Sequence, residues 1–232
     1  MASLSTAGCR PQPMAYNARV KPLPGAPPRR PPSATMTSHR LLSPRDFRRM
    51  PWKNGGGRTA EIAAWTREAG TEPFAGRVSI AEIEQDGPFS AWPGIDRTFV
   101  LLDGAGVVLT QGGIVVEVVA RHEPVRFAGD EASACRLVDG PARAFNLMVR
   151  RDRARRDVVV ADGEATIAGP FRFGVCYAAE GASECLLPGR APIAVAEGHA
   201  LLVDGEDRLA SMHVNPIDAG AVAIVAALDA GA

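Results

Sequence analysis

The sequence predicts an all-β protein, and two patterns along the chain support that fold class. Short apolar or alternating segments recur, and the clearest of them places Phe145, Leu147 and Val149 on one face of a strand and Asn146 on the other. Glycine-containing turns separate these segments, as is typical of a β-sandwich or β-barrel. No long amphipathic helix pattern accompanies them, which argues against a parallel α/β sheet.

The strand pattern begins after a short polar segment and continues to the end of the chain. The last segment is ambiguous, because its alanines would also suit a terminal helix. Turn signals such as Asp86-Gly87-Pro88, Gly112-Gly113 and Asp139-Gly140-Pro141 lie between the segments. The expected strands cover 59–65, 77–84, 98–102, 107–110, 114–119, 135–138, 145–150, 158–160, 171–177, 193–195, 200–203 and 221–228.

One short helix is expected ahead of these strands. Order should begin near His39, and Ser43 is suited to cap a helix whose first turn holds Pro44 and Asp46. Pro51 would end it.

Residues 1–35 differ in composition from the rest of the chain, since they are rich in proline and arginine and contain no acid. Such a segment buries too little apolar surface to order itself, so we expect it to be disordered or a non-native extension. Our hypothesis is that Met36 is the natural start. An organellar transit peptide is the alternative, but the proline density argues against an amphipathic helix.

The overall composition limits the classes of partner. The chain has 232 residues, 46% hydrophobic side chains and a formal net charge of zero, enough for one large domain or two small β modules. A neutral balance does not call for nucleic acid or a membrane surface. No apolar run approaches a membrane span or a secretory signal, so we expect a cytoplasmic protein. The arginine-rich run 150–157 is interpreted as a solvated connection, with modules at 36–155 and 156–232.

The residues that commonly bind metals are scattered. His39, His122, His199 and His213 lie far apart with no His-x-His pair, so neither a metal nor another cofactor is expected. No Cys-x-x-Cys motif occurs either. A disulfide between Cys176 and Cys185 is conceivable, but we favour reduced structural thiols here and at Cys9 and Cys135.

A dense polar block precedes the first strand and suggests a binding site. Trp52, Lys53 and Asn54 supply an aromatic wall, a cation and an amide, and three glycines follow them. This combination suits a small molecule that carries a carboxylate. The alternative is a flexible loop capped by a buried tryptophan.

Further polar residues occur on the predicted strands and their ends. Arg77 and Ser79 share a strand face, which would line a cavity if it points inward and would be plain surface if it points outward. Arg97 could clamp an anion or pair with Asp96. Asn146 lies opposite the apolar face of its strand.

Several of these motifs together resemble the HutD/Ves family. The resemblance is carried by Trp52-Lys53-Asn54-Gly55-Gly56-Gly57-Arg58-Thr59, Arg77-Val78-Ser79, Gly87-Pro88-Phe89-Ser90, Pro93-Gly94-Ile95-Asp96-Arg97 and Phe145-Asn146-Leu147-Met148, in that order. It extends from about Arg40 to Arg151 and is weaker beyond. It implies a cupin-like β-barrel of the RmlC jelly-roll type, with two barrel modules in one chain (a bicupin), and a homodimer.

The resemblance also implies a role in bacterial histidine utilisation, in which the protein binds an intermediate such as urocanate or N-formylglutamate. Lys53, Arg77 and Arg97 would then neutralise carboxylates. The alternatives are a cupin-type isomerase or lyase, with Glu61 or Asp96 as general base, and an interaction module without a ligand. The candidate ligand-binding residues are Trp52, Lys53, Asn54, Thr59, Glu61, Arg77, Ser79, Ser90, Asp96, Arg97 and Asn146.

Overall fold

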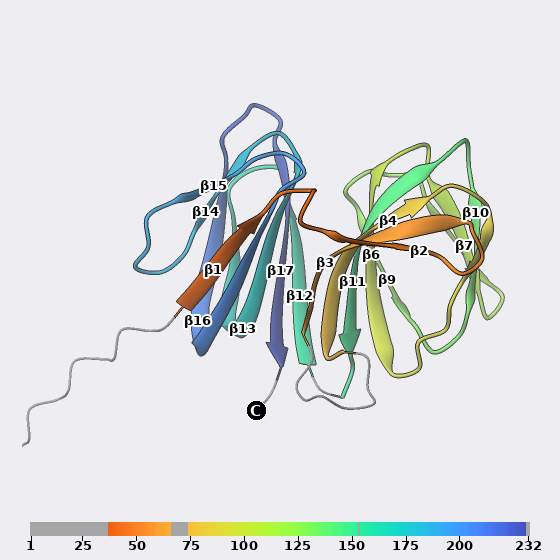
Figure 1. The fold of residues 1–232 in the computed structure, drawn as a ribbon, viewed down its shortest axis with the longest axis horizontal. Coiled ribbons are helices and arrows are strands. Elements are labelled where there is room, and N and C mark those ends of the chain that lie inside the picture. Colours follow the sequence, from red (N-terminus) through yellow and green to blue (C-terminus); the bar gives the residue numbers. More distant parts are fainter. Residues whose placement is uncertain (1–36, 66–73, 153, 231–232) are drawn as a thin grey trace, which may run out of the picture. The chain divides into compact units, whose positions relative to one another are not determined.

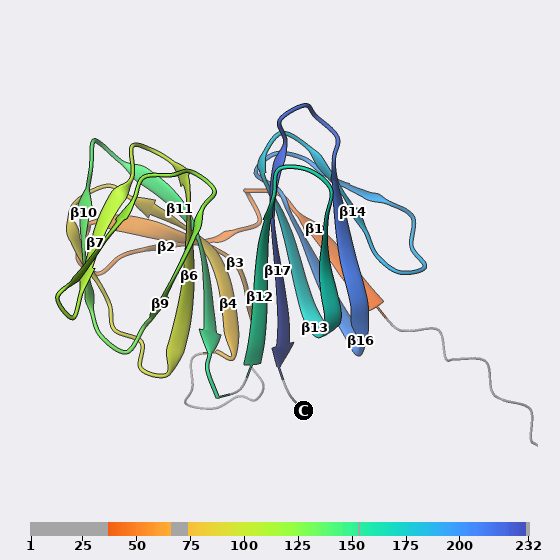
Figure 2. The ribbon, with the colours of Figure 1, turned by 180° about the vertical axis from the view of Figure 1, so that it is seen from behind.

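The computed structural model describes residues 37–65, 74–152 and 154–230. Within these ranges every regular element is a β-strand, so the all-β prediction is confirmed. The strands form three sheets, seen from two sides in Figures 1 and 2. In chain order they are β1 (Thr37–Leu42), β2 (Arg48–Pro51), β3 (Gly57–Trp65), β4 (Gly76–Ile83), β5 (Gly87–Phe89), β6 (Ile95–Asp103), β7 (Val107–Gln111), β8 (Ile114–Val118), β9 (Pro124–Ala128), β10 (Ser133–Leu137), β11 (Ala142–Arg150), β12 (Ala154–Ala161), β13 (Ala165–Glu180), β14 (Ser183–Leu186), β15 (Ile193–Val195), β16 (Ala200–Pro216) and β17 (Val222–Ala230).

Two of the sheets face each other and enclose a hydrophobic core. The six-stranded sheet has the order β2-β3-β4-β11-β6-β9, and the four-stranded sheet has the order β5-β10-β7-β8. Phe99 and Ala144 of the first sheet pack in one cluster with Leu109, Val118 and Cys135 of the second. We call the side of the six-stranded sheet that faces this cluster its inner face.

The third sheet is built mainly from the second half of the chain. Its order is β12-β17-β13-β16-β14-β15, and β1 pairs antiparallel with β16 along its whole length. The first described strand therefore belongs to the sheet formed by the last strands, and the predicted boundary at 155/156 falls inside β12. The division into modules at that boundary stays a prediction.

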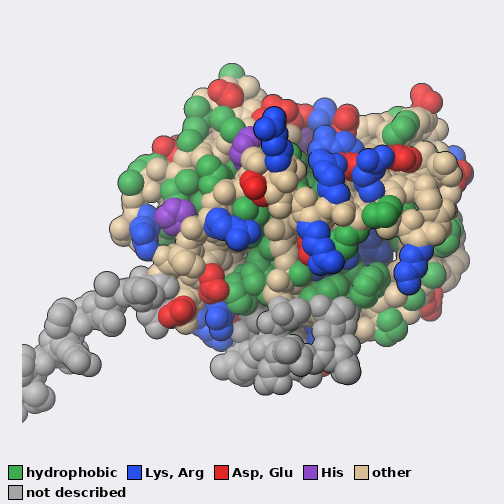
Figure 3. All heavy atoms as spheres, viewed as in Figure 1, with side chains coloured by type: hydrophobic (Ala, Val, Ile, Leu, Met, Phe, Trp, Pro, Cys, Tyr) green, Lys and Arg blue, Asp and Glu red, His purple; other side chains and the backbone are tan. Residues whose placement is uncertain are grey.

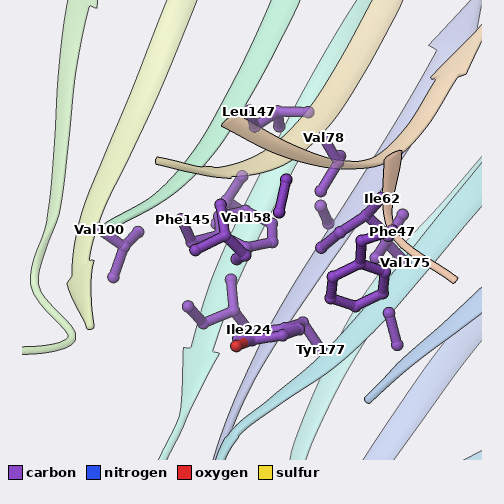
Figure 4. Packing of buried hydrophobic residues seen from close by; sticks show 14 of the residues in the cluster. Phe47, Ile62, Val78, Val100, Phe145, Leu147, Val158, Val175, Tyr177 and Ile224 are labelled. Atoms are coloured by element: carbon purple, nitrogen blue, oxygen red, sulfur yellow. The ribbon is translucent and has the colours of Figure 1, made fainter. Parts of the chain in front are cut away.

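A second core joins the outer face of the six-stranded sheet to the seven-stranded sheet. Phe145 and Leu147 of β11 are fully buried there against Tyr177 and Ile224, and Figure 4 shows these side chains converging between the two sets of strands. The aromatic rings of Phe145 and Tyr177 lie 5.9 Å apart. Because both faces of the six-stranded sheet are covered, polar residues on its inner face are removed from bulk water.

The expected helix at 43–50 is absent, and this prediction was wrong. The capping chemistry is present, since Ser43 N and Ser43 Oγ both donate to Oδ2 of Asp46, at 2.8 and 2.7 Å, but it closes a turn. Phe47 directly follows this turn and is buried in the core between the sheets. Burial of that ring and the start of β2 at the next residue hold the segment in a turn and leave no room for a helix.

Most of the other differences between the sequence predictions and the structure are short strands that the sequence analysis missed. The ambiguous segment at the end of the chain is the strand β17. The short or polar strands β1, β2, β5, β9 and β14 were not predicted. Residues 1–35 and the proposed start at Met36 lie outside the described residues. Among the described residues, no helix has the length and apolarity needed to cross a membrane.

Candidate functional site

The inner face of the six-stranded sheet carries a group of polar side chains that the strand register brings together. Ser79 of β4 lies opposite Glu61 of β3 on one side and opposite Asn146 of β11 on the other. In the adjacent row, Met148 of β11 lies between Arg77 and Arg97. Because side chains alternate along a strand, both rows point to the same side as the buried alanines at 81 and 144.

Arg97 is the most deeply buried cation of this group, with 8% of its surface exposed. Its Nη2 donates to Oδ1 of Asn146 at 3.2 Å, and Asn146 is itself buried. The guanidinium lies over the rings of Phe89 and Phe127, at 5.1 and 5.0 Å from their centroids. Its Nε is buried and has no hydrogen-bond partner among the described residues.

Arg77 differs from Arg97 because it has a carboxylate partner. Its Nε donates to Oε2 of Glu61 at 2.8 Å, and both side chains are largely buried. The exposed Arg48 also approaches Glu61, at 3.8 Å. No described carboxylate forms an ion pair with Arg97, so the inner face holds one guanidinium without a counter-charge.

The pKa of Arg97 reflects this uncompensated burial. Removal of the guanidinium from water, together with the nearby positive charge of Arg77, lowers the pKa to about 10. The side chain is still protonated at neutral pH. Burial also raises the pKa of the neighbouring Cys135 thiol to about 12, so this cysteine is neutral and supplies no counter-charge. A buried cation without a paired anion favours an anionic ligand.

Trp52 and Thr59 form the wall of the site next to β3. The indole Nε1 of Trp52 donates to Oγ1 of Thr59 at 2.8 Å, and its ring packs edge-on against Phe89. Gly57 allows this close packing, because a Cβ atom there would lie 2.2 Å from the backbone oxygen of Glu82. The glycine-rich segment therefore serves chain packing at Gly57.

The structure does not bring every predicted site residue to this group. Lys53 and Asn54 are exposed in the turn between β2 and β3, where Oδ1 of Asn54 accepts the backbone N–H of Gly56. Ser90 is exposed just after β5. Asp96 points to the opposite side of β6 from Arg97, as neighbours on a strand must, and it accepts from Nε of Arg151 at 2.8 Å.

The outer surface beside the site carries a separate set of charges. Figure 3 shows many Lys and Arg side chains on the face that bears β1, β2 and β3 in Figure 1, with carboxylates between them. Glu82 binds Arg49 at 3.0 Å and Arg58 at 3.3 Å, and Arg58 also binds Glu84. These ion pairs form a connected network on the surface and are distinct from the buried pair of Arg77 and Glu61.

Phe89 and Phe127 belong to the site although the sequence analysis did not select them as binding residues. Both are positioned by short strands that were not predicted. Pairing of β9 with β6 places Phe127 directly opposite Arg97. Within the described ranges, no three His, Cys, Asp or Glu side chains gather where they could hold a metal ion.

The architecture and this site define a class: a cupin-like β-protein with a buried cationic cluster on the inner face of one sheet. Solved structures of low sequence identity support the fold alone. Oxalate decarboxylase from Lactobacillus farciminis is 7% identical with a TM-score of 0.56, over 81% of this chain and 85% of its own. Ylba from Escherichia coli is 10% identical with a TM-score of 0.59, over 84% and 94%.

Closer similarities identify the family. The family model HutD matches residues 44–222, and the chain belongs to the HutD family. Protein Ves of Cronobacter sakazakii is 40% identical over 59% of this chain and 76% of its own length. A 21.2 kDa protein encoded in the hutC 3′ region of Pseudomonas putida is 32% identical over 77% and 94%. HutD from Pseudomonas fluorescens has 30% identity and a TM-score of 0.72, over 84% of this chain and all of its own.

Proposed function

We propose that this protein is a metal-free regulatory protein of histidine utilisation that binds a small carboxylate intermediate such as urocanate or N-formylglutamate. Family membership and a relative encoded beside hutC support the pathway. We propose further that the protein is a cytoplasmic bicupin that uses no cofactor and acts without nucleic acid or a membrane.

The uncompensated charge of Arg97 is the observation that carries the ligand assignment. A buried guanidinium with an unpartnered Nε costs free energy in the empty protein, and a carboxylate that accepted from it would recover that cost. The planar guanidinium can offer two parallel N–H donors to the two oxygens of a carboxylate.

The surrounding residues suit the rest of such a ligand. Asn146 and Ser79 are buried and offer an amide and a hydroxyl beside the guanidinium. Phe89 and Phe127 provide the apolar walls that small-molecule sites usually have. Glu61, already held by Arg77, could accept a hydrogen bond from an N–H group of the ligand.

An isomerase or lyase acting on a small acid is the second candidate function. It requires a carboxylate free to act as a general base. Glu61 is bound by Arg77 and Arg48, and Asp96 by Arg151 on the other side of β6. These ion pairs favour binding over catalysis.

Isothermal titration calorimetry with urocanate and with N-formylglutamate tests the proposal. We expect one of them to bind with a stoichiometry of one per chain. Absence of heat from both at millimolar concentration would overturn the ligand assignment. Chromatography of the acid after prolonged incubation with the protein separates the two functions, because a binding protein returns it unchanged.

A further inference from the structure

The strand β8 leaves an apolar surface uncovered. Ile114, Val115 and Val119 are 68%, 60% and 52% exposed, and Val116 is 36% exposed. β8 is the last strand of the four-stranded sheet and pairs only with β7 among the described strands. Exposed β-branched residues on a sheet edge are a surface suited to pairing with another strand.

The hairpin geometry shows which backbone groups of β8 face the open edge. Gly112 and Gly113 form a two-residue turn with both φ angles positive, and Gln111 lies opposite Ile114. The residues that close such a turn are a hydrogen-bonded pair, and hydrogen-bonded pairs recur at every second residue. Ile114, Val116 and Val118 therefore bond to β7, and the N–H and C=O groups of Val115 and Glu117 point outward.

The hairpin is also held in place. Nε2 of Gln111 donates to the backbone oxygens of Ala128 and Glu131, at 2.8 and 2.9 Å. These bonds fix the end of β7 to the segment after β9. The open edge is therefore presented by an anchored hairpin, which lowers the entropy cost of pairing.

The other edges of these two sheets carry the residues that usually prevent pairing. β2 contains two exposed arginines and Pro51, β5 contains Pro88, and β9 begins with Pro124 and contains the exposed Arg126. β8 has neither proline nor a basic residue, and Glu117 is its one charge. Proline and basic residues protect edges from pairing, so their absence distinguishes β8.

We propose that β8 pairs antiparallel with β8 of a second copy of this chain, with Val116 opposite Val116 of the partner subunit. In this register the outward backbone N–H and C=O groups of Val115 hydrogen-bond with those of Glu117 of the partner subunit. The two-fold symmetry produces a second, identical set of hydrogen bonds. The two four-stranded sheets then become one continuous sheet.

The position of Glu117 on β8 favours this register over its two neighbours. Since only odd-numbered residues have outward backbone groups, the allowed registers differ by two residues. Moving the register one way places Glu117 opposite the same glutamate of the partner subunit, which is unfavourable. Moving it the other way places Glu117 opposite Gly113 of the partner subunit and loses a side-chain pair. The central register keeps the like charges apart and leaves every residue of β8 opposite a side chain.

A contact through one short strand is small, so the dimer is expected to dissociate in the micromolar range. Sedimentation velocity from about 1 to 300 µM, without added ligand, tests it. We expect the wild type to shift from monomer to dimer across this range. A wild type that remains monomeric at the highest concentration would overturn the proposal.

Two substitutions on adjacent residues test the register. Val116→Lys puts two lysines opposite each other at the two-fold axis, and we expect at least tenfold weaker association. Val115→Lys removes more exposed apolar surface, but its lysine faces Glu117 of the partner subunit, so we expect the dimer to persist. Ile217→Lys, at an exposed apolar residue outside β8, is the control and leaves association unchanged. Equal loss in both β8 variants would overturn the register.

A covalent test does not depend on the fold tolerating a lysine. Opposed residues in a non-hydrogen-bonded pair have Cα atoms about 4.5 Å apart, which is within the range that a disulfide spans. Val116→Cys should therefore form a disulfide-linked dimer under mild oxidation, above any background seen with the wild type. Failure of Val116→Cys to cross-link at 300 µM would contradict the proposed pairing.

Discussion

Nη2 of Arg97 donates to Oδ1 of Asn146 across 3.2 Å, and both side chains are buried on adjacent strands of one sheet. The amide oxygen satisfies one guanidinium N–H but supplies no negative charge. This pair therefore holds a buried cation in position without neutralising it, which costs stability and is the basis of the proposed anion binding.

Replacement of Arg97 by methionine should separate binding from stability. Loss of a buried charged partner costs about 2 to 5 kcal/mol of binding free energy, so affinity for N-formylglutamate or urocanate should fall roughly thirtyfold or more. The thermal midpoint of the ligand-free protein should stay the same or rise, because an uncompensated buried charge is removed. Calorimetry and thermal unfolding measure the two effects.

Arg126→Met is the matched control for this variant. Arg126 is exposed on β9, beside the strand that carries Arg97. It should change neither binding nor the thermal midpoint. Unchanged affinity in Arg97→Met would remove Arg97 from the binding site.

Replacement of Asn146 by aspartate should close the site with an internal ion pair. The new carboxylate would occupy the position of the amide that now accepts from Arg97 and would supply the missing negative charge. We expect at least tenfold weaker binding of the carboxylate ligand and a higher thermal midpoint. Asn215→Asp, the same chemical change on β16, is the control for binding. Tighter binding in Asn146→Asp would contradict the proposed role of Arg97.

Strand alternation predicted much of the site. It placed Arg77 and Ser79 on one face and Asn146 opposite the apolar residues of β11, and the structure has both arrangements. The same rule separates Asp96 from Arg97, so treating these two as one cluster overlooked a consequence of the pattern. Asn54 was selected as a binding residue because of its amide group, although asparagine side chains in turns commonly hydrogen-bond to the backbone of the same turn.

The remaining features depend on contacts between distant parts of the chain. β1 is a polar strand and β9 a short one that begins with proline; both exist because β16 and β6 bind them, and nothing within either segment signals those partners. The turn at Ser43 has the side-chain chemistry of a helix cap, and burial of Phe47 favours the turn over a helix. Phe127 reaches Arg97 through the pairing of β9, so this wall of the site could not be assigned from spacing alone.

The lowered pKa of Arg97 predicts proton uptake when an anion binds at high pH. With a pKa of about 10, Arg97 is partly deprotonated near pH 10 in the ligand-free protein, and a carboxylate favours the protonated form. Binding should take up about half a proton there and none through Arg97 at pH 7. Affinity should fall by roughly tenfold per pH unit above pH 10.

Titration calorimetry in two buffers of different ionisation enthalpy measures this uptake. Rising pH should affect the stability of the ligand-free protein in the opposite direction from ligand affinity. Folding lowers the pKa of Arg97, so its destabilising effect on the empty protein is present below pH 10 and declines as the pH rises through that value. Arg97→Met should show no proton uptake, and equal uptake in both proteins would assign it to another group.

The close approach of β3 to β4 makes Gly57 a position where a single methyl group should disturb the site. A Cβ atom there would lie 2.2 Å from the backbone oxygen of Glu82 and 3.2 Å from the indole of Trp52, so Gly57→Ala must separate the strands or displace that ring. We expect a loss of about 2 kcal/mol or more in the free energy of unfolding, measured by urea denaturation. Gly163→Ala has open space around its Cβ and should change the free energy of unfolding by less than about 0.5 kcal/mol.

Because Trp52 donates to Thr59 beside the buried cation, Gly57→Ala should also weaken ligand binding, whereas Gly163→Ala should not. Equal stability of the two variants would show that β3 and β4 lie farther apart than the structure places them.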